Sequence, residues 1–370
     1  MCNTIMTFFR TITTLFLLTI CLIVNAVHPV LSKPTLKVLD IGNSYTNDAT
    51  ELLPLITDAS GADVSNMCLY KAIRSSASFK SWYDVYCDKD TAYKYTIKKV
   101  LGGLSANVST GTGAKGDGSL FRELLSEEQW DIIIIHQVST YAPYYEQWNG
   151  TGKGGYLNEL LSIIKKHQPN TVIGFYLIHS LWDHHTRNKE GSSYDRWKLI
   201  SSSVKKLQQE YGVDFIIPYG TAIENMRSSS LNNEYDLTRD GTHLAYGLGR
   251  YTAACCYYES LIAPRSGISV LGNSARYDAS KAASSKYPSI SVTDENALIA
   301  QKAAVLATKH MFECINPEST SSVVPLKESE TDISLYNYNL LGQKQYKDER
   351  NLHGVYIKNG RKVYGKTSIK

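Results

Sequence analysis

Apolar segments alternate with amphipathic segments along most of the chain. Short apolar runs bounded by turn residues predict strands, and longer stretches with apolar residues three or four positions apart predict helices. The predicted strands are 36–41, 64–71, 131–135, 172–178 and 215–218, and the predicted helices are 48–58, 119–125, 156–167, 194–211, 244–261 and 295–312. This alternation predicts a mainly parallel sheet covered by helices on both faces, which is a three-layer α/β/α sandwich.

Two motifs at opposite ends of this pattern carry candidate chemistry. Gly42-Asn43-Ser44 follows the first predicted strand and would place a serine hydroxyl on a sharp strand-to-helix turn. Asp240 and His243 lie three residues apart, directly before the predicted helix 244–261. A serine becomes a good nucleophile when a histidine, itself oriented by a carboxylate, takes its proton. Each motif alone could be a turn or a helix cap, but their order together favours a hydrolase.

With these motifs, residues 33–315 resemble the SGNH (GDSL-like) hydrolases, and most closely an uncharacterised SGNH-like family of secreted bacterial proteins. The resemblance implies an SGNH/flavodoxin-like fold and a serine esterase without metal or organic cofactor. It assigns Ser44 as the nucleophile, His243 as general base and acid, and Asp240 as the orienting carboxylate. In that family, two middle blocks supply further donors for the oxyanion.

The middle blocks of this chain differ from the family pattern. Ser76 stands where the family has a glycine, and its added Cβ would be unfavourable if the position needs a positive φ. After the strand 131–135, His136 and Gln137 replace the usual Gly-x-Asn; we favour Gln137 as a donor because an amide donates at any pH. We count these three residues, with Asn43, as candidate oxyanion or substrate-binding residues.

The first 26 residues predict a signal peptide. Arg10 precedes an apolar segment that runs to Val24, and Val24-Asn25-Ala26 suits a cleavage site. The apolar segment is shorter than the roughly 20 residues of a membrane span. We therefore expect an exported protein, periplasmic, at the cell surface or secreted, with no stable membrane insertion of the mature chain.

The charge and the spacing of possible metal ligands argue against nucleic-acid binding and against a metal site. The formal net charge of +4 falls by one when residues 1–26 are removed, and no Lys/Arg block suggests nucleic-acid binding. Asp183-His184-His185 has metal-ligand residue types without the spacing of a site, so we expect no metal. The 26 tyrosines include Tyr141, Tyr144 and Tyr145, and the segment 141–148 that contains them could contact sugar rings. The Gly-rich segment 102–118 is predicted to be a loop at the edge of the site.

The composition changes beyond residue 315. Residues 316–332 are rich in Ser, Thr, Glu and Pro and predict a linker, and residues 333–370 predict short strands with an Asn359-Gly360 hairpin turn. This tail resembles the sorting or anchoring modules of type IX secretion substrates; a small β appendage without a transport role is the alternative.

The sequence thus favours an exported esterase that removes acyl groups, with acetyl esters on glycans as the preferred substrate. Two alternatives stay open: a lipase or thioesterase of the same type, which needs a wide apolar cleft, and a glycan-binding protein that keeps the fold but has weak catalysis.

Overall fold

The computed structural model describes residues 28–213, 215–232 and 234–319, and the strands 336–339, 344–346, 355–358 and 361–364. The predicted signal peptide lies outside the described residues, as does nearly all of the predicted linker. The chain divides into two compact units, residues 1–321 and 322–370. Within the described part of the chain, no helix has the length and apolar character needed to cross a membrane.

The first unit is built on one seven-stranded sheet, whose strand order is β4-β3-β2-β1-β5-β6-β7. Five neighbouring strands, from β2 to β7, run parallel, whereas β3 runs antiparallel to both of its neighbours. The strands are β1 (Leu36–Gly42), β2 (Met67–Arg74), β3 (Tyr95–Leu101), β4 (Gly111–Gly113), β5 (Ile132–Ile135), β6 (Val172–Tyr176) and β7 (Phe215–Ile217).

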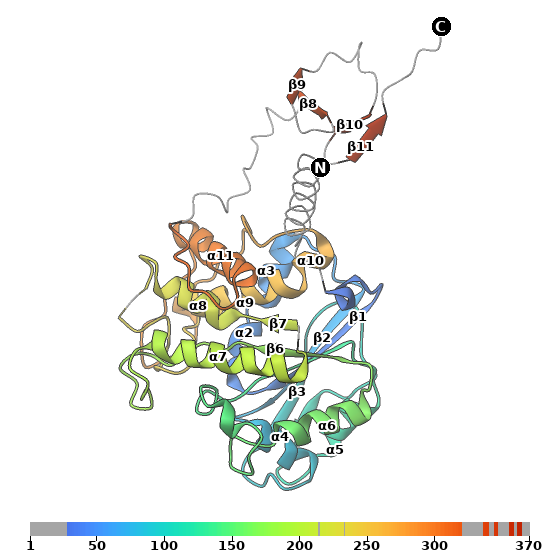
Figure 1. Cartoon of the computed structure of the whole chain (residues 1–370), viewed down its shortest axis with the longest axis vertical. Helices are drawn as coiled ribbons and strands as arrows, with labels where there is room; N and C mark the ends of the chain where they lie inside the picture. Colours follow the sequence, from blue (N-terminus) through green and yellow to red (C-terminus); the bar gives the residue numbers. More distant parts are fainter. Residues whose placement is uncertain are drawn as a thin grey trace, which may run out of the picture. The chain divides into compact units, whose positions relative to one another are not determined.

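Helices pack in two groups, which Figure 1 shows on either side of the sheet. One group contains α2 (Ser44–Thr50), α3 (Leu53–Ser60), α8 (Tyr219–Arg227), α9 (Leu248–Leu261) and α11 (Asp294–Lys309). The other contains α4 (Phe79–Tyr86), α5 (Ser119–Ser126) and α6 (Leu157–His167). The remaining helices are α7 (Ser193–Tyr211), the short α10 (Ala263–Ser266), and the 3-10 turns η1 (Pro29–Ser32), η2 (Tyr145–Gln147) and η3 (Ala279–Lys281). The expected three-layer α/β/α fold is confirmed.

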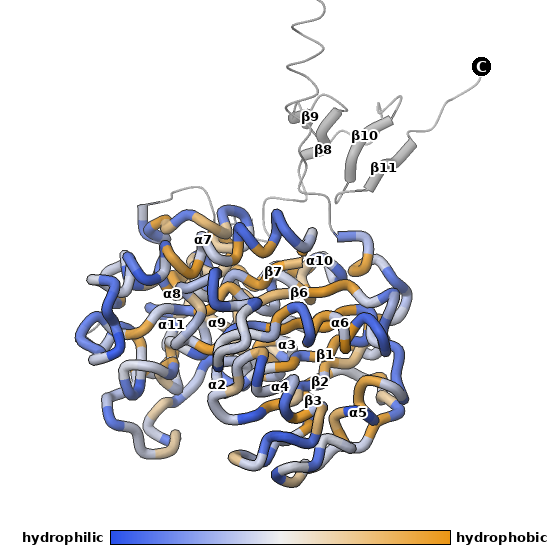
Figure 2. Tube along the Cα trace, turned by 60° about the horizontal axis from the view of Figure 1, so that its bottom comes forward, coloured by the Kyte–Doolittle hydropathy of each residue, from blue (hydrophilic) through white to orange (hydrophobic). Residues whose placement is uncertain are grey.

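The core follows from the apolar runs of the sequence. All four residues of β5 are buried, and in β1 only Lys37 is partly exposed, as expected for strands covered on both faces. Figure 2 shows this hydrophobic interior along β1, β6 and β7. Helix α9 is buried nearly all round because it lies against α2, α3, α8 and α11. Its adjacent Cys255 and Cys256 are both fully buried.

Some element bounds differ from the sequence prediction. The helix predicted at 48–58 is two helices, because Pro54 has no N–H to donate and begins the first turn of α3 instead of continuing α2. The helix predicted from residue 244 begins at Leu248. Strand β3 was not predicted, since its central Lys98 and Lys99 are exposed and interrupt its apolar pattern. The predicted loop 102–118 contains the short strand β4.

The second unit contains a four-stranded sheet with the order β11-β10-β8-β9. Its strands are antiparallel: β8 (Tyr336–Asn339), β9 (Lys344–Tyr346), β10 (Val355–Lys358) and β11 (Arg361–Tyr364). Lys358 pairs with Arg361, which leaves two residues between the strands at the position of the expected Asn-Gly turn. The resemblance to a sorting module stays a prediction.

Candidate active site

Ser44 is held at the end of the central strand β1 by a turn that requires glycine. A Cβ on Gly42 would lie 2.2 Å from both the His136 ring nitrogen Nε2 and the Thr46 hydroxyl, so a larger residue would displace the turn. Asn43 caps α2: its Oδ1 accepts the backbone N–H of Tyr45 at 2.9 Å. Ser44 is therefore the first helical residue, and its side chain is half-buried at the carboxyl edge of the sheet.

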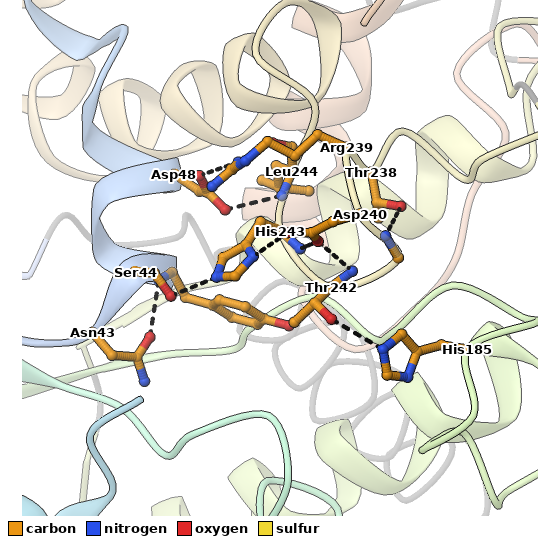
Figure 3. A network of polar contacts seen from close by, with 12 residues as sticks. Asn43, Ser44, Asp48, His185, Thr238, Arg239, Asp240, Thr242, His243 and Leu244 are labelled. Carbon is orange, nitrogen blue, oxygen red and sulfur yellow. Dashed lines mark hydrogen bonds and ion pairs between the residues drawn. The ribbon is translucent and has the colours of Figure 1, made fainter. Parts of the chain in front are cut away.

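Asp240 and His243 lie in the loop before α9, where they meet Ser44 (Figure 3). The Asp240 carboxylate accepts the His243 ring N–H at Nδ1, at 2.7 Å, and the backbone N–H groups of Thr242 and His243, at 2.9 and 2.7 Å. A carboxylate only accepts, so Nδ1 carries the proton and Nε2 is left to accept the Ser44 hydroxyl at 2.8 Å. Gly241, with φ +82°, provides the backbone conformation that closes this loop.

The electrostatics of Asp240 favour its charged form. Partial burial alone would raise the pKa of this carboxyl, but the hydrogen bonds from the His243 ring and backbone and from Thr242 bring it well below its ordinary value. A permanently ionised Asp240 keeps the imidazole of His243 in one tautomer and one orientation. The three side chains therefore form a hydrogen-bonded chain from carboxylate to imidazole to hydroxyl.

Asp48 connects the helix that begins at Ser44 with the loop of His243. The sequence analysis did not identify this residue. This fully buried carboxylate, one helical turn after Ser44, accepts the backbone N–H of Leu244 at 2.9 Å. It also pairs with Arg239 at 2.8 Å and with Arg250 of α9 at 2.9 Å. The signal that could have revealed it is its i+4 spacing from Ser44 together with an arginine directly before Asp240.

A buried aromatic pair, Tyr45 and His179, packs against the loop that carries His243. The ring of Tyr45 stacks on His179 with 4.3 Å between centroids and meets the edge of His243 at 5.9 Å. Burial lowers the pKa of His179 to about 3, so this histidine is neutral. Its Nε2 lies 2.8 Å from the carbonyl oxygen of Thr242 and donates to it. The position of His243 is therefore fixed through its neighbour Thr242 as well as through Asp240.

Ser76 lines the same cavity as Ser44 and stands in a turn of left-handed backbone. Its φ is +51°, so this serine occupies a conformation that favours glycine. Two side-chain contacts hold the turn: Arg74 donates to the carbonyl oxygen of Ser75 at 2.7 Å, and the Asn43 amide donates to that of Ala77 at 2.9 Å. Among the hydrogen bonds between described residues, none uses the backbone N–H of Ser44 or Ser76.

The other candidate oxyanion residues are placed differently from the sequence interpretation. Gln137 is buried and does not line the cavity at Ser44: its amide donates to the Gly154 carbonyl at 2.8 Å and its Oε1 accepts the N–H of Val138. His136 is also buried; its Nε2 lies 2.9 Å from the Thr46 hydroxyl, and burial lowers its pKa to about 4. Because neither side chain lines the cavity at Ser44, Gln137 and His136 are not placed to donate to an oxyanion there. Asn43 lines the cavity, and its side chain connects the turn of Ser44 with the turn of Ser76 through its bonds to Tyr45 and Ala77.

An open cavity of about 680 Å³ lies at Ser44 and His243. Most of the residues that line it are polar or charged, with Ala92 and Val138 as the aliphatic members. Two tyrosines line it, Tyr93 and Tyr141, besides Tyr45. Trp148, from the tyrosine-rich segment expected to contact sugars, is buried instead. The segment 102–118, expected at the edge of the site, contributes no lining residue.

The described residues contain no cluster of side chains suited to bind a metal ion. No group of three or more His, Cys, Asp or Glu side chains among them could hold an ion. Asp183 instead caps α7 by accepting the N–H of Ser193, and the His185 ring lies 3.3 Å from the Thr242 hydroxyl. The five cysteines in this part of the chain are all free.

Comparisons with known proteins place this fold in a family. A family model described as a domain of unknown function (DUF4886) matches residues 37–292. A crystal structure of a DUF4886 family protein from Bacteroides uniformis is 25% identical to this chain, with a TM-score of 0.58 over 76% of this chain and 98% of that chain. No curated protein matches this chain significantly in sequence.

Two more distant structures are similar to parts of the chain. A candidate SGNH hydrolase from Slackia heliotrinireducens is 12% identical, with a TM-score of 0.40 over 61% of this chain and 98% of that chain. An acetyl xylan esterase from the rumen bacterium Butyrivibrio proteoclasticus is 16% identical, with a TM-score of 0.21 over 50% of this chain and 55% of that chain.

Proposed function

The chain belongs to the DUF4886 family, whose description assigns no function, and we propose from the geometry of its site that this member is a serine esterase. The observation that carries the proposal is the hydrogen-bonded chain Asp240–His243–Ser44, with 2.7 Å and 2.8 Å between successive partners. These are the distances and the order of roles that nucleophilic acyl transfer requires. Ser44, at the end of this hydrogen-bonded series, lines an open cavity that can admit a substrate.

The reaction would proceed through an acyl-enzyme. The Ser44 Oγ attacks the ester carbonyl carbon while His243 Nε2 takes the hydroxyl proton. His243 then donates that proton to the departing alcohol oxygen, the C–O bond of the ester breaks, and the acyl group stays on Ser44. A water molecule, deprotonated by His243, releases the acid in the same way. Asp240 stays ionised throughout and stabilises the imidazolium that forms twice.

Two backbone amides would stabilise the oxyanion. Ser44 and Ser76 both line the cavity, and the backbone N–H groups of both have no partner among the described residues. Loss of one such donor typically costs about 10²- to 10³-fold in kcat. This arrangement explains how serine can stand in the place of the family's glycine, since the backbone and not the side chain acts there.

The cavity favours a polar ester substrate over a lipid. A lipase or thioesterase needs a wide apolar surface for the acyl chain, whereas this cavity has two small aliphatic side chains in its lining, Ala92 and Val138. Tyr93 and Tyr141 offer rings of the kind that contact sugars. We therefore propose short acyl groups, acetyl above all, on a glycan or similar polyol. A glycan-binding protein without efficient catalysis is the second candidate, favoured by the absence of Gln137 from the cavity.

Hydrolysis of an aryl acetate by the purified protein tests the proposal. We expect activity in the wild type and a loss of at least about 10³-fold in Ser44→Ala and in His243→Ala. Ser126→Ala and His310→Ala change the same residue types at exposed positions outside the cavity and serve as matched controls. Equal activity in Ser44→Ala and wild type would contradict the mechanism, and an inactive folded wild type that binds glycans would favour the second candidate.

We further propose that the protein is exported, on the support of the N-terminal sequence. N-terminal sequencing of the protein from its native cells should then start directly after Ala26. An N-terminus at Met1 in the mature protein would contradict export by this signal.

A further inference from the structure

The cavity at Ser44 is richer in cations than its function as an esterase requires. Five basic side chains line it, and two carboxylates: Arg74, Lys80, Lys89, Lys153, Arg187, Asp84 and Asp90. A neutral ester needs no charge for its recognition. The excess of positive charge therefore points to the substrate and not to the chemistry of the triad.

Two of the five cations are neutralised within the protein. Arg74 forms a two-pronged ion pair with Asp90, at 2.6 and 3.0 Å, and both side chains are about nine-tenths buried. Lys80 pairs with Asp84, one helical turn further along α4, at 2.5 Å. Both carboxylates of the cavity are thus engaged. They leave the other three cations without a counter-charge in the lining.

The three remaining cations are exposed. None of the ion pairs between described residues involves Lys89, Lys153 or Arg187. Three uncompensated cations around one cavity repel one another, and an anionic ligand would relieve that repulsion.

Arg187 is the best placed of the three. Two of its guanidinium nitrogens donate to hydroxyls of the cavity wall, Nη1 to Thr140 and Nη2 to Thr242, each at 3.2 Å. These bonds fix the guanidinium beside Thr242, the residue directly before His243. A guanidinium has five N–H donors, so three remain after these two contacts. A carboxylate is the group that such a planar fork binds best.

We infer that the cavity takes esters whose alcohol portion carries a carboxylate, with Arg187 binding that carboxylate close to the triad. Acylated glycans that contain uronic acid units are the natural substrates with this chemistry. Lys89 and Lys153 add a positive field along the cavity for the further acidic units of such a chain. This inference rests on the proposed esterase function, since it specifies the substrate of the same site.

Matched esters that differ only in charge test the inference. 4-Acetoxybenzoate and 4-acetoxybenzamide, with their 3-isomers, present the same acetyl ester with and without a carboxylate. The measured quantity is the ratio of kcat/KM for the acid to that for the amide. Comparing this ratio between variants cancels the different intrinsic reactivities of the two esters. It also separates a binding role of Arg187 from a structural one, since a distorted site would slow both esters alike.

We expect Arg187→Gln to lower the ratio by about fivefold, the size expected for one charge-assisted contact that solvent partly screens. Arg187→Lys should retain part of the preference because it keeps the charge but not the fork. Lys281→Gln removes a cation whose side chain is 82% exposed and which does not line the cavity, so the ratio should stay at the wild-type value. Raising the salt concentration from about 0.05 to 0.5 M should lower the wild-type ratio.

The outcomes distinguish the inference from the function beneath it. If the wild type hydrolyses both esters and Arg187→Gln leaves the ratio unchanged, the carboxylate site is refuted while the esterase stands. An equal fall of the ratio in Arg187→Gln and Lys281→Gln would also refute it, because the effect would then come from net charge alone. If the folded wild type hydrolyses neither the acids nor the amides, the proposed function itself fails.

Discussion

Replacing Asp40 by asparagine should change how the stability of the protein depends on pH. Asp40 lies in the middle of β1 with no exposed surface, and its carboxyl oxygens accept the hydroxyl of Tyr176 at 2.6 Å and that of Tyr257 at 3.1 Å. Burial raises its pKa from 3.8 to about 7, although both tyrosines and Lys71 act in the opposite direction. Asparagine has nearly the same shape but cannot ionise.

The sign follows from the two pKa values. Well below pH 4 the carboxyl is protonated in both states, and its contribution to stability is fully present. As the pH rises towards 7, the unfolded chain releases the proton and the folded protein retains it, so the free energy of unfolding falls. At about 1.4 kcal/mol per pH unit the complete loss is about 4 kcal/mol, of which about 2.5 kcal/mol falls between pH 5 and pH 8.

Urea denaturation of wild type and Asp40→Asn at pH 5 and pH 8 measures this loss. The free energy of unfolding of the wild type, relative to the variant, should fall by about 2.5 kcal/mol between the two pH values. Asp117→Asn is the control: hydrogen bonds from the backbone and side chain of Ser119 lower the pKa of that exposed acid, so it is ionised in both states throughout this range. If wild type and Asp40→Asn keep a constant difference from pH 5 to pH 8, Asp40 is not a buried neutral acid and the reasoning is wrong.

Three further substitutions test the site. Asp240→Asn should lower kcat for an aryl acetate by about 10²- to 10⁴-fold, because an amide no longer holds His243 in the right tautomer; steady-state kinetics showing less than a tenfold loss would contradict this. Asp48→Asn leaves Arg239 and Arg250 without their buried partner and should reduce the free energy of unfolding by about 3 kcal/mol in urea titrations. A change below about 1 kcal/mol would show that the charge of Asp48 is dispensable. Ser76→Gly should raise the free energy of unfolding by about 0.5–1 kcal/mol, since glycine adopts φ +51° without strain; a lower stability would mean that the serine side chain supports the turn.

The sequence predicted the parts of the fold that local patterns determine. The five parallel strands were all found, because strands buried on both faces are continuous apolar runs such as the four isoleucines of β5. The two motifs that the folded structure brings together, at Ser44 and at Asp240–His243, were also found, since turn residues and short spacings are visible in the sequence. Their catalytic roles stay predictions.

Features that depend on tertiary contacts were missed or misplaced. Gln137 was assigned to the oxyanion from its position after a strand, but its direction depends on the carbonyl of Gly154, which no local pattern reveals. Asp48 looked like an ordinary helix residue, since its partners lie about 200 positions away. The exposed lysines of β3 concealed a strand near the edge of the sheet, where one face meets solvent.

The distance along the chain between the two halves of the site has a consequence for how the protein acquires activity. Ser44 and His243 are 199 residues apart in sequence, and the bond between them forms only after five parallel strands have paired. Contacts of such large sequence separation form slowly and late in folding. An intermediate with a complete sheet but an undocked α9 would therefore carry the nucleophile without its base. Recovery of hydrolysis after dilution from denaturant should lag behind recovery of secondary structure, which makes enzymatic turnover a reporter of the last folding step.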